Sequence, residues 1–186
     1  MKCPSCQQGE LKYSQLEEFL PCQTCNHCGG NWLLLIDYLS WQSVTKFAAT
    51  TDETHTNTTI EADESSHALI CPVTGTLMTK YRISSKSTHK IDLSTAANAI
   101  WLDKGEWVLL KQQGLSHKLN SIFTEPYQKH IREELASKTF EELYQHQFGK
   151  EAYQQLKTFR TWLDKQDKRA AMLAYLIAED PYSAIR

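Results

Sequence analysis

Six cysteines are the side chains with the clearest chemical potential in this 186-residue sequence. They are Cys3, Cys6, Cys22, Cys25, Cys28 and Cys71. Five of the six lie within the first 28 residues. In a reducing compartment, such a cluster is typical of a metal site rather than of disulfides.

The spacing of four of these cysteines narrows the choice of metal. Cys3-x₂-Cys6 and Cys25-x₂-Cys28 are two CxxC pairs with eighteen residues between them, which is a zinc-site pattern. A CxxC turn brings two sulfurs close enough to share one ion at about 2.3 Å from each. We therefore predict one Zn²⁺ per chain, held by Cys3, Cys6, Cys25 and Cys28. The short segment has little core of its own, so the metal should supply folding energy.

Two neighbours of this set are alternative ligands. Cys22 forms a further CxxC pair with Cys25, and His27 offers a nitrogen ligand. An internal repeat of the chain favours Cys25 and Cys28 as the ligands.

A redox role for the CxxC pairs is disfavoured because no βαβ pattern surrounds them. Four thiolates closed on zinc would also leave no position for a catalytic water. We see no Ser/His/Asp grouping, phosphate loop or HExxH motif, and expect a protein that is not an enzyme.

A second segment repeats the outline of the first. Cys-Pro at residue 3 is followed by Trp-Leu 29 positions later, and Cys-Pro at residue 71 by Trp-Leu 30 positions later. Where the first segment has Cys6, Cys25 and Cys28, the second has Thr74, Ser94 and Ala97. One remaining thiolate cannot hold a structural zinc, which takes four ligands. The second segment is therefore predicted to fold without metal, around its apolar residues.

These motifs resemble a known family. The pattern CPxC, then CxxCGGxWL, with WLDxGE following, resembles the transcription-factor-type zinc ribbon of small bacterial proteins. The first segment departs from it after Leu33, and the second carries Trp101 to Glu106 faithfully but lacks the cysteines. The resemblance covers residues 1–41 and 69–113. It implies a zinc ribbon, with Trp32 and Trp101 in the core, and a helix start at Asp103 and Glu106. It does not establish transcription, because a fold does not fix a function.

Charge divides the chain further. Residues 47–68 carry five acidic and no basic side chains, with Ile60 as the one large aliphatic residue. Such a segment cannot bury enough apolar surface to fold, so we expect an acidic, disordered linker. An acidic peptide that docks a partner is the alternative. Residues 69–123, by contrast, carry a net charge of +4, within a chain total of −2.

Four cations gather in a predicted hairpin of the second segment. They are Lys80, Arg82, Lys86 and Lys90, and no acidic residue lies between them. Here a nucleic-acid phosphate or an acidic protein surface could dock. The alternative is a solvated hairpin face that keeps the sheet soluble.

The remainder of the chain has helical periodicity. We expect helices to start at residues 124–126 and at Thr139, where Thr-x-x-Glu resembles a capping box. Another helix should cover residues 153–163. Residues 170–178 are apolar all round, which predicts a buried final helix. Together these segments suggest a small helical bundle.

The sequence thus predicts an α+β protein: a zinc ribbon (1–46), the acidic linker (47–68), a degenerate metal-free ribbon (69–114) and a helical bundle (115–186). We expect a zinc-binding adaptor whose partner is nucleic acid or a protein of the transcription or translation machinery. A protein-interaction or assembly module without nucleic-acid binding is the first alternative, and a metal-dependent enzyme the second. No apolar run reaches the roughly 20 residues of a membrane span and no apolar leader opens the chain, which favours the cytoplasm. The oligomeric state is left open.

Overall fold

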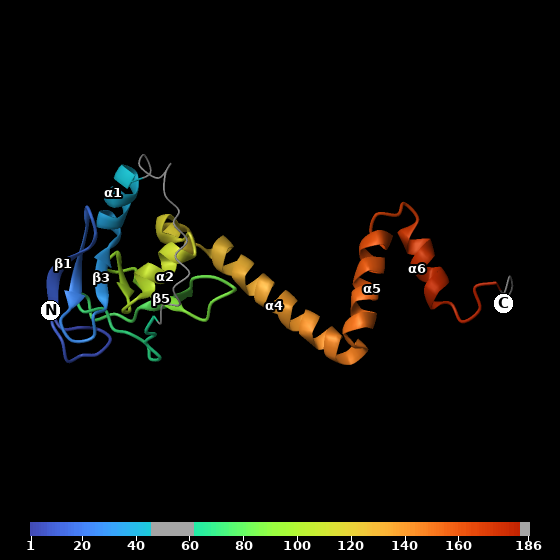
Figure 1. Ribbon diagram of the computed structural model, residues 1–186, viewed down its shortest axis with the longest axis horizontal. Coiled ribbons are helices and arrows are strands. Elements are labelled where there is room, and N and C mark those ends of the chain that lie inside the picture. Colours follow the sequence, from blue (N-terminus) through green and yellow to red (C-terminus); the bar gives the residue numbers. More distant parts are fainter. Residues whose placement is uncertain (46–61, 183–186) are drawn as a thin grey trace. The chain divides into compact units, whose positions relative to one another are not determined.

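A six-stranded antiparallel sheet organises the first part of the chain (Figure 1). The computed structural model describes residues 1–45 and 62–182, and divides the chain into two compact units, Met1–Glu134 and Leu135–Arg186. The strands are β1 (Leu11–Glu17), β2 (Leu20–Cys25), β3 (Asn31–Leu34), β4 (Thr79–Arg82), β5 (Lys90–Ser94) and β6 (Ala99–Leu102). Within the described residues, six helices and a 3₁₀ turn complete an α+β fold.

The strand order is β1-β2-β3-β6-β5-β4, so the two halves of the sheet meet at β3 and β6. At this junction Trp32 lies opposite Trp101. Segments 1–46 and 69–114, expected as separate domains, thus contribute to one continuous sheet. Within each half the register is the same: Gln23 opposes Trp32 in β2–β3, and Asp92 opposes Trp101 in β5–β6.

Alternation along the strands sorts the buried side chains into two clusters, one on each face of the sheet. In β6, Ile100 and Leu102 belong to the cluster that the helices cover, whereas Ala99 and Trp101 belong to the other. The second cluster also contains Cys3, Cys25 and Cys71. The sheet therefore separates a helix-covered core from a cysteine-containing core.

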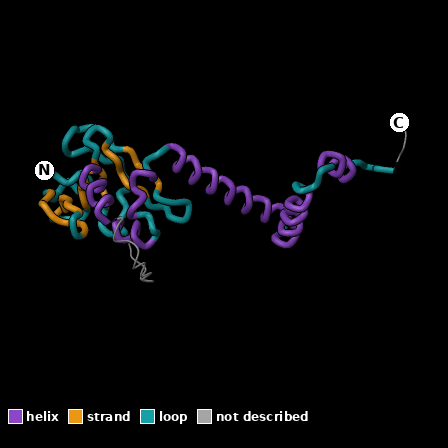
Figure 2. The backbone as a smooth tube through the Cα atoms, turned by 90° about the horizontal axis from the view of Figure 1, so that it is seen from above, coloured by secondary structure: helices purple, strands orange, loops and turns teal. Residues whose placement is uncertain are grey.

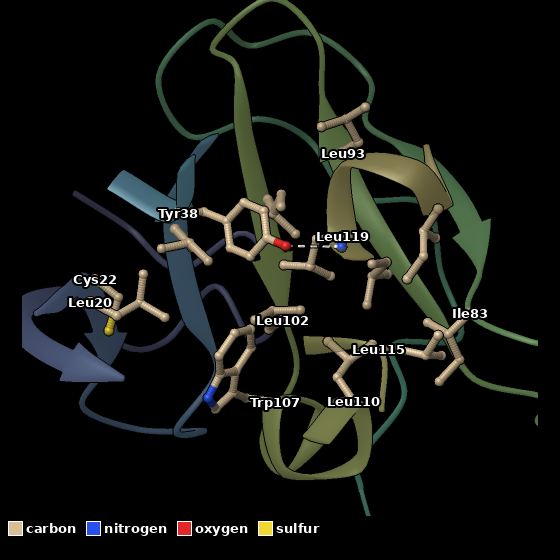
Figure 3. Close-up of a cluster of buried hydrophobic side chains, with 14 of the residues drawn as sticks. Leu20, Cys22, Tyr38, Ile83, Leu93, Leu102, Trp107, Leu110, Leu115 and Leu119 are labelled. Atoms are coloured by element: carbon tan, nitrogen blue, oxygen red, sulfur yellow. Dashed lines mark hydrogen bonds between the residues drawn. The ribbon is translucent and has the colours of Figure 1, made fainter. Parts of the chain in front are cut away.

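Short helices cover the first of these faces, whose buried side chains are drawn in Figure 3. They are α1 (Leu35–Thr45), α2 (Glu106–Gln112), the 3₁₀ turn η1 (Ser116–Lys118) and α3 (Leu119–Ile122). Trp41 of α1 meets Trp107 of α2 edge-on, with ring centroids 5.4 Å apart. The hydroxyl of Tyr38 accepts a hydrogen bond of 3.1 Å from the backbone N–H of Leu119 (Figure 3).

This packing extends the first unit beyond the expected boundary at residue 114. Leu115, Leu119 and Ile122 are buried in the same core as the strands. Tyr127 of α4 (Glu125–Phe148) donates a hydrogen bond of 2.8 Å to the carbonyl of Ile83. Residues 115–134 therefore belong with the sheet, because their apolar side chains complete its helix-covered face.

The predicted acidic linker lies mostly outside the described residues, which resume at residue 62. Its last residues contact the second half of the sheet. The backbone N–H of Asp63 donates to the carbonyl of Lys104 at 2.9 Å, and Ser65 is buried. The N–H of Ser65 donates to Asp103 at 2.6 Å. Residues 62–68 are thus partly packed rather than wholly solvated, because the carboxylate of Asp103 fixes them.

The second unit is built of helices, drawn in purple in Figure 2. It contains the end of α4, then α5 (Lys150–Leu163) and α6 (Arg169–Ile177). Thr139 does not start a helix, because α4 runs through it and its hydroxyl donates to the carbonyl of Leu135 at 3.0 Å. The expected burial of the final apolar helix is also wrong, since α6 has no buried residue. An apolar composition shows what a helix can bury, but not what is available to cover it. None of the described helices is both long and apolar enough to cross a membrane.

Candidate metal centre

Two backbone turns carry the four predicted ligands. Cys3 and Cys6 lie in the turn before β1, whereas Cys25 ends β2 and Cys28 lies in the turn before β3. The N–H of Cys3 donates to the carbonyl of Gly9 at 2.9 Å, which closes the first turn. The second turn closes with a bond of 3.0 Å from the N–H of Gly29 to the carbonyl of Cys25.

The four sulfur atoms gather at one point. All of them lie within 4.8 Å of one another. The Sγ atoms of Cys3 and Cys28 are 3.6 Å apart, and those of Cys6 and Cys25 are 3.7 Å apart. A tetrahedral site with Zn–S bonds of about 2.3 Å has sulfur–sulfur edges of about 3.8 Å. The observed spacing therefore fits one zinc ion per chain, as the cysteine pattern predicts.

Comparison with known proteins agrees with this geometry. Residues 2–43 match the family model described as the transcription factor zinc-finger. The matched N-terminal segment is similar to the zinc ribbon of that family. The match contains all four cysteines, β1 to β3 and most of α1. No curated protein and no solved structure matches the chain.

Backbone amides of the zinc ribbon point at its sulfurs. The N–H of Cys6 lies 3.4 Å from Sγ of Cys3, and the N–H of Gly9 lies 3.4 Å from Sγ of Cys6. In the second turn the N–H of Cys28 lies 3.5 Å from Sγ of Cys25. Donors at this distance favour a charged thiolate, which is the form that binds zinc.

The pKa values of the thiols show why the metal matters for this site. Burial raises the pKa of Cys3, and burial raises that of Cys28 to about 11. Burial acts in the same direction on Cys6, but the N–H groups of Gly9 and Gln8 outweigh it and lower the pKa of that thiol to about 6. Several buried thiols cannot all ionise unless a cation compensates their negative charge. Because zinc binds the thiolate form, its binding should release protons from these cysteines.

The structure places the two alternative ligands, Cys22 and His27, outside the cluster of four sulfur atoms. Cys22 and Cys25 are three positions apart on β2, so their side chains face opposite sides of the sheet. Cys22 lies in the helix-covered core, with Sγ 3.6 Å from the hydroxyl of Thr24. The side chain of His27 is exposed. Within residues 1–45 and 62–182, the group able to hold a metal consists of the four predicted cysteines.

The second half of the sheet has turns with the same hydrogen bonds as the zinc ribbon. The N–H of Thr74 lies 3.4 Å from Sγ of Cys71, and the N–H of Ala97 lies 3.3 Å from the hydroxyl of Ser94. Gly75 has φ +71°, close to the +56° of Gln7 in the equivalent turn of the ribbon. Burial acts to raise the pKa of Cys71, but hydrogen bonds from Ser94 and Thr74 outweigh it and lower that pKa.

The four cations of the predicted basic hairpin have different surroundings in the structure. Nζ of Lys80 lies 2.8 Å from Oδ2 of Asp92, whose side chain is 2% exposed. Lys80 therefore neutralises a buried carboxylate instead of offering a free charge. Arg82 faces Lys90 across β4 and β5, and Lys86 is exposed in the connection between them. The cations available to a partner are thus Arg82, Lys86 and Lys90.

The tryptophans and the acidic residues of the WLDxGE motif have roles in packing and in hydrogen bonding. Trp32 and Trp101 are buried, which confirms that they are core residues. Nε1 of Trp101 donates to Oδ1 of Asp103 at 2.7 Å, and the N–H of Asp103 donates to Oε2 of Glu106 at 2.8 Å. Burial raises the pKa of Glu106 to about 9. Asp103 and Glu106 thus fix the turn before α2.

Two glycines have roles that sequence patterns did not reveal. A Cβ atom on Gly9 would overlap Sγ of the ligand Cys25 and lie 2.8 Å from Cβ of His27. A Cβ atom on Gly30 would overlap the indole of Trp101 and lie 2.8 Å from its Cη2. The contact of Gly30 with Trp101 depends on the pairing of β3 with β6, for which the sequence offers no local signal.

Proposed function

We propose that this protein is a non-enzymatic, zinc-stabilised adaptor that binds nucleic acid through the β4–β5 hairpin. The observation that carries the proposal is the match of residues 2–43 to the transcription factor zinc-finger. The cations of the hairpin supply the second support. The free thiols would remain available to zinc in a reducing compartment such as the cytoplasm.

The donor set supports a structural role for the metal. Four thiolates complete a tetrahedral zinc site, whereas catalytic zinc keeps one position open for water or substrate. The ion would hold the two turns together and keep β1 to β3 in register. The chemistry that zinc supplies here is therefore folding energy.

The second half of the sheet is proposed to be a metal-free copy of the ribbon. The shared register of its strands and the matching turns support this view. Thr74, Ser94 and Ala97 stand where the ribbon has ligands, and the buried Ile100 and Trp101 stabilise the sheet instead. One zinc ion would then stabilise a sheet made of two related halves, of which the second presents the binding surface.

The proposed contact surface comprises Arg82, Lys86 and Lys90. Arg82 on the edge strand β4 is paired with Lys90 on the adjacent strand β5, and Lys86 is exposed in the connection between them. The segment 69–123, which includes them, has a net charge of +4. Contacts of this kind neutralise phosphates and release counterions, so the affinity should fall steeply with salt.

The test measures binding of a labelled duplex DNA and a labelled single-stranded RNA over a range of salt concentrations. The variant R82E/K86E/K90E keeps Lys80, so the sheet remains intact. The matched control K138E/K150E/K165E makes the same change of charge in the second unit. We expect at least a tenfold loss of affinity for the hairpin variant and little loss for the control. Equal losses in the two variants, or no binding by the unmodified protein, would overturn the proposal.

A protein-interaction module is the second candidate function. The observation in its favour is the large number of exposed apolar side chains in the second unit. A partner that co-purifies from native lysate after nuclease treatment, and that R82E/K86E/K90E still retains, would favour this candidate over nucleic-acid binding.

A further inference from the structure

The helices of the second unit leave most of their apolar side chains exposed. Eleven large apolar residues of α4, α5 and α6 between residues 140 and 177 are 39% to 82% exposed. Among the described residues of this unit, Leu163 alone is buried. Monomeric proteins rarely expose contiguous apolar patches larger than roughly a few hundred Å².

Three of these side chains form a stripe on α4. On α4, Phe140, Tyr144 and Phe148 recur every four residues, and the ring of Tyr144 stacks on that of Phe148 with centroids 5.6 Å apart. Tyr144 also stacks on Tyr153 of α5 at 6.4 Å. This spacing places the stripe of α4 on one helix face, which continues onto α5.

A groove lies between α5 and α6. It has a volume of about 400 Å³, and its apolar lining comes mainly from Phe159, Trp162, Met172, Tyr175 and Leu176. The second unit therefore offers both protruding aromatic rings and a groove of a size that could receive them.

The lengths of the helices argue that something covers these faces. The helix α5 has 14 residues and α6 has nine. Isolated helices shorter than about 12–15 residues are marginal in water, and helices in proteins are stabilised by packing of an apolar face. One copy of the second unit supplies little such packing, because it buries only Leu163 among its described residues.

The exposed area is large enough for a stable dimer. Eleven side chains that are about half exposed, at roughly 150–250 Å² for each aromatic residue, leave on the order of 1,000 Å² of apolar surface. A stable protein–protein interface needs about 800 Å² from each partner. The available surface therefore meets the requirement of a two-fold interface.

We infer that the second unit binds a second copy of this chain, and that α4, α5 and α6 of two chains bury their apolar faces against each other. Charge favours this occupant. Residues 135–186 carry eight basic and seven acidic side chains, so two copies do not repel each other. The inference stands independently of nucleic-acid binding.

The test is sedimentation equilibrium of the full zinc-loaded chain from about 1 to 100 μM. The chain has a mass of 21.4 kDa, and we expect a species of twice that mass. Leu156→Glu and Leu176→Glu should each weaken the dimer at least tenfold. Gln155→Glu, which adds the same charge beside Leu156, should leave it intact. Equal zinc content in all variants verifies that the first unit is folded.

A monomer at the highest concentration, or a dimer that both leucine variants leave unchanged, would overturn the inference. Hydrogen exchange of the unmodified chain gives a readout that needs no variant. Amides of residues 150–177 should become more protected as the concentration rises. Protection that is independent of concentration, or that appears only with phosphatidylglycerol vesicles, would instead rule out the second copy as the occupant.

Discussion

Trp32 and Trp101 lie directly opposite each other on β3 and β6, the two strands that join the halves of the sheet. Both side chains are buried on the face that contains the zinc ligands. The zinc ribbon and the second half of the sheet therefore share one core. A substitution on one side of this junction should change the stability of the other side.

Gly30→Ala tests this junction. The added methyl group would overlap the indole of Trp101, so we expect a loss of about 1–3 kcal/mol in the free energy of unfolding. Chemical denaturation of the zinc-loaded protein measures it. In a Trp101→Phe background the overlapping ring atoms are absent, and the same substitution should cost less. Equal costs in the two backgrounds would show that Gly30 and Trp101 are not coupled.

Gly9→Ala tests the packing around the metal. Its methyl group would overlap Sγ of Cys25, so the ligand has to move from its place in the tetrahedron. We expect at least a tenfold loss of zinc affinity, measured by competition with a chelator. Gln8→Ala changes an exposed neighbour and should have no effect. An unchanged affinity in Gly9→Ala would contradict the observed geometry.

Metal analysis of three cysteine variants tests the ligand set. Cys3→Ser removes one of four ligands and should abolish stoichiometric zinc binding. Cys22→Ser and Cys71→Ser should each retain one zinc per chain, because both thiols lie outside the cluster. Loss of zinc in either of these two, or two zinc ions in the unmodified chain, would refute the assignment.

The zinc site could be predicted from sequence because its information is local. Each CxxC pair sets its own turn, and the separation of the pairs suits one tetrahedron. The exclusion of Cys22 was not local, because it depends on the face of β2 from which that side chain projects. The ion pair of Lys80 was missed for a related reason: Asp92 lies opposite Lys80 only once the register of β4 and β5 is known.

Lys80→Met tests the buried ion pair. It would leave the carboxylate of Asp92 buried without its cation, and breaking such a pair costs about 3–5 kcal/mol. Denaturant unfolding of the zinc-loaded protein measures this cost. Lys86→Met removes an exposed cation of the same hairpin and should change stability by less than about 0.5 kcal/mol. Similar effects of the two substitutions would mean that Lys80 is solvated.

The raised pKa of Glu106 predicts how the free energy of unfolding varies with pH. Burial raises its pKa in the folded chain from 4.5 to about 9, so the folded state binds the proton more tightly than the unfolded state. Its contribution is complete below the unfolded pKa and is lost as the pH rises towards 9. Between pH 6.5 and 8.5, where zinc remains bound, stability should fall by roughly 1 kcal/mol per pH unit. Glu106→Gln should abolish this slope, and an unchanged slope would exclude Glu106 as its source.

The helices show a second limit of prediction from sequence. The stop at Gly149, which has φ +81°, could be anticipated because glycine adopts that conformation readily. The continuity of α4 through Thr139 could not, because a capping box and a helix interior share the same residue types. The exposure of α6 could not be foreseen either, since its neighbours are set by tertiary packing.

The pairing of β3 with β6 also determines how a truncated chain should behave. If residues 1–45 were produced alone, β3 would keep β2 but lose β6 along its whole length, and Trp32 would lose Trp101 opposite it. A strand with free N–H and C=O groups and an apolar face is a template for aggregation. The isolated fragment should therefore self-assemble or precipitate even when saturated with zinc. Its solubility would depend on whether residues 62–134 are present to cap the strand.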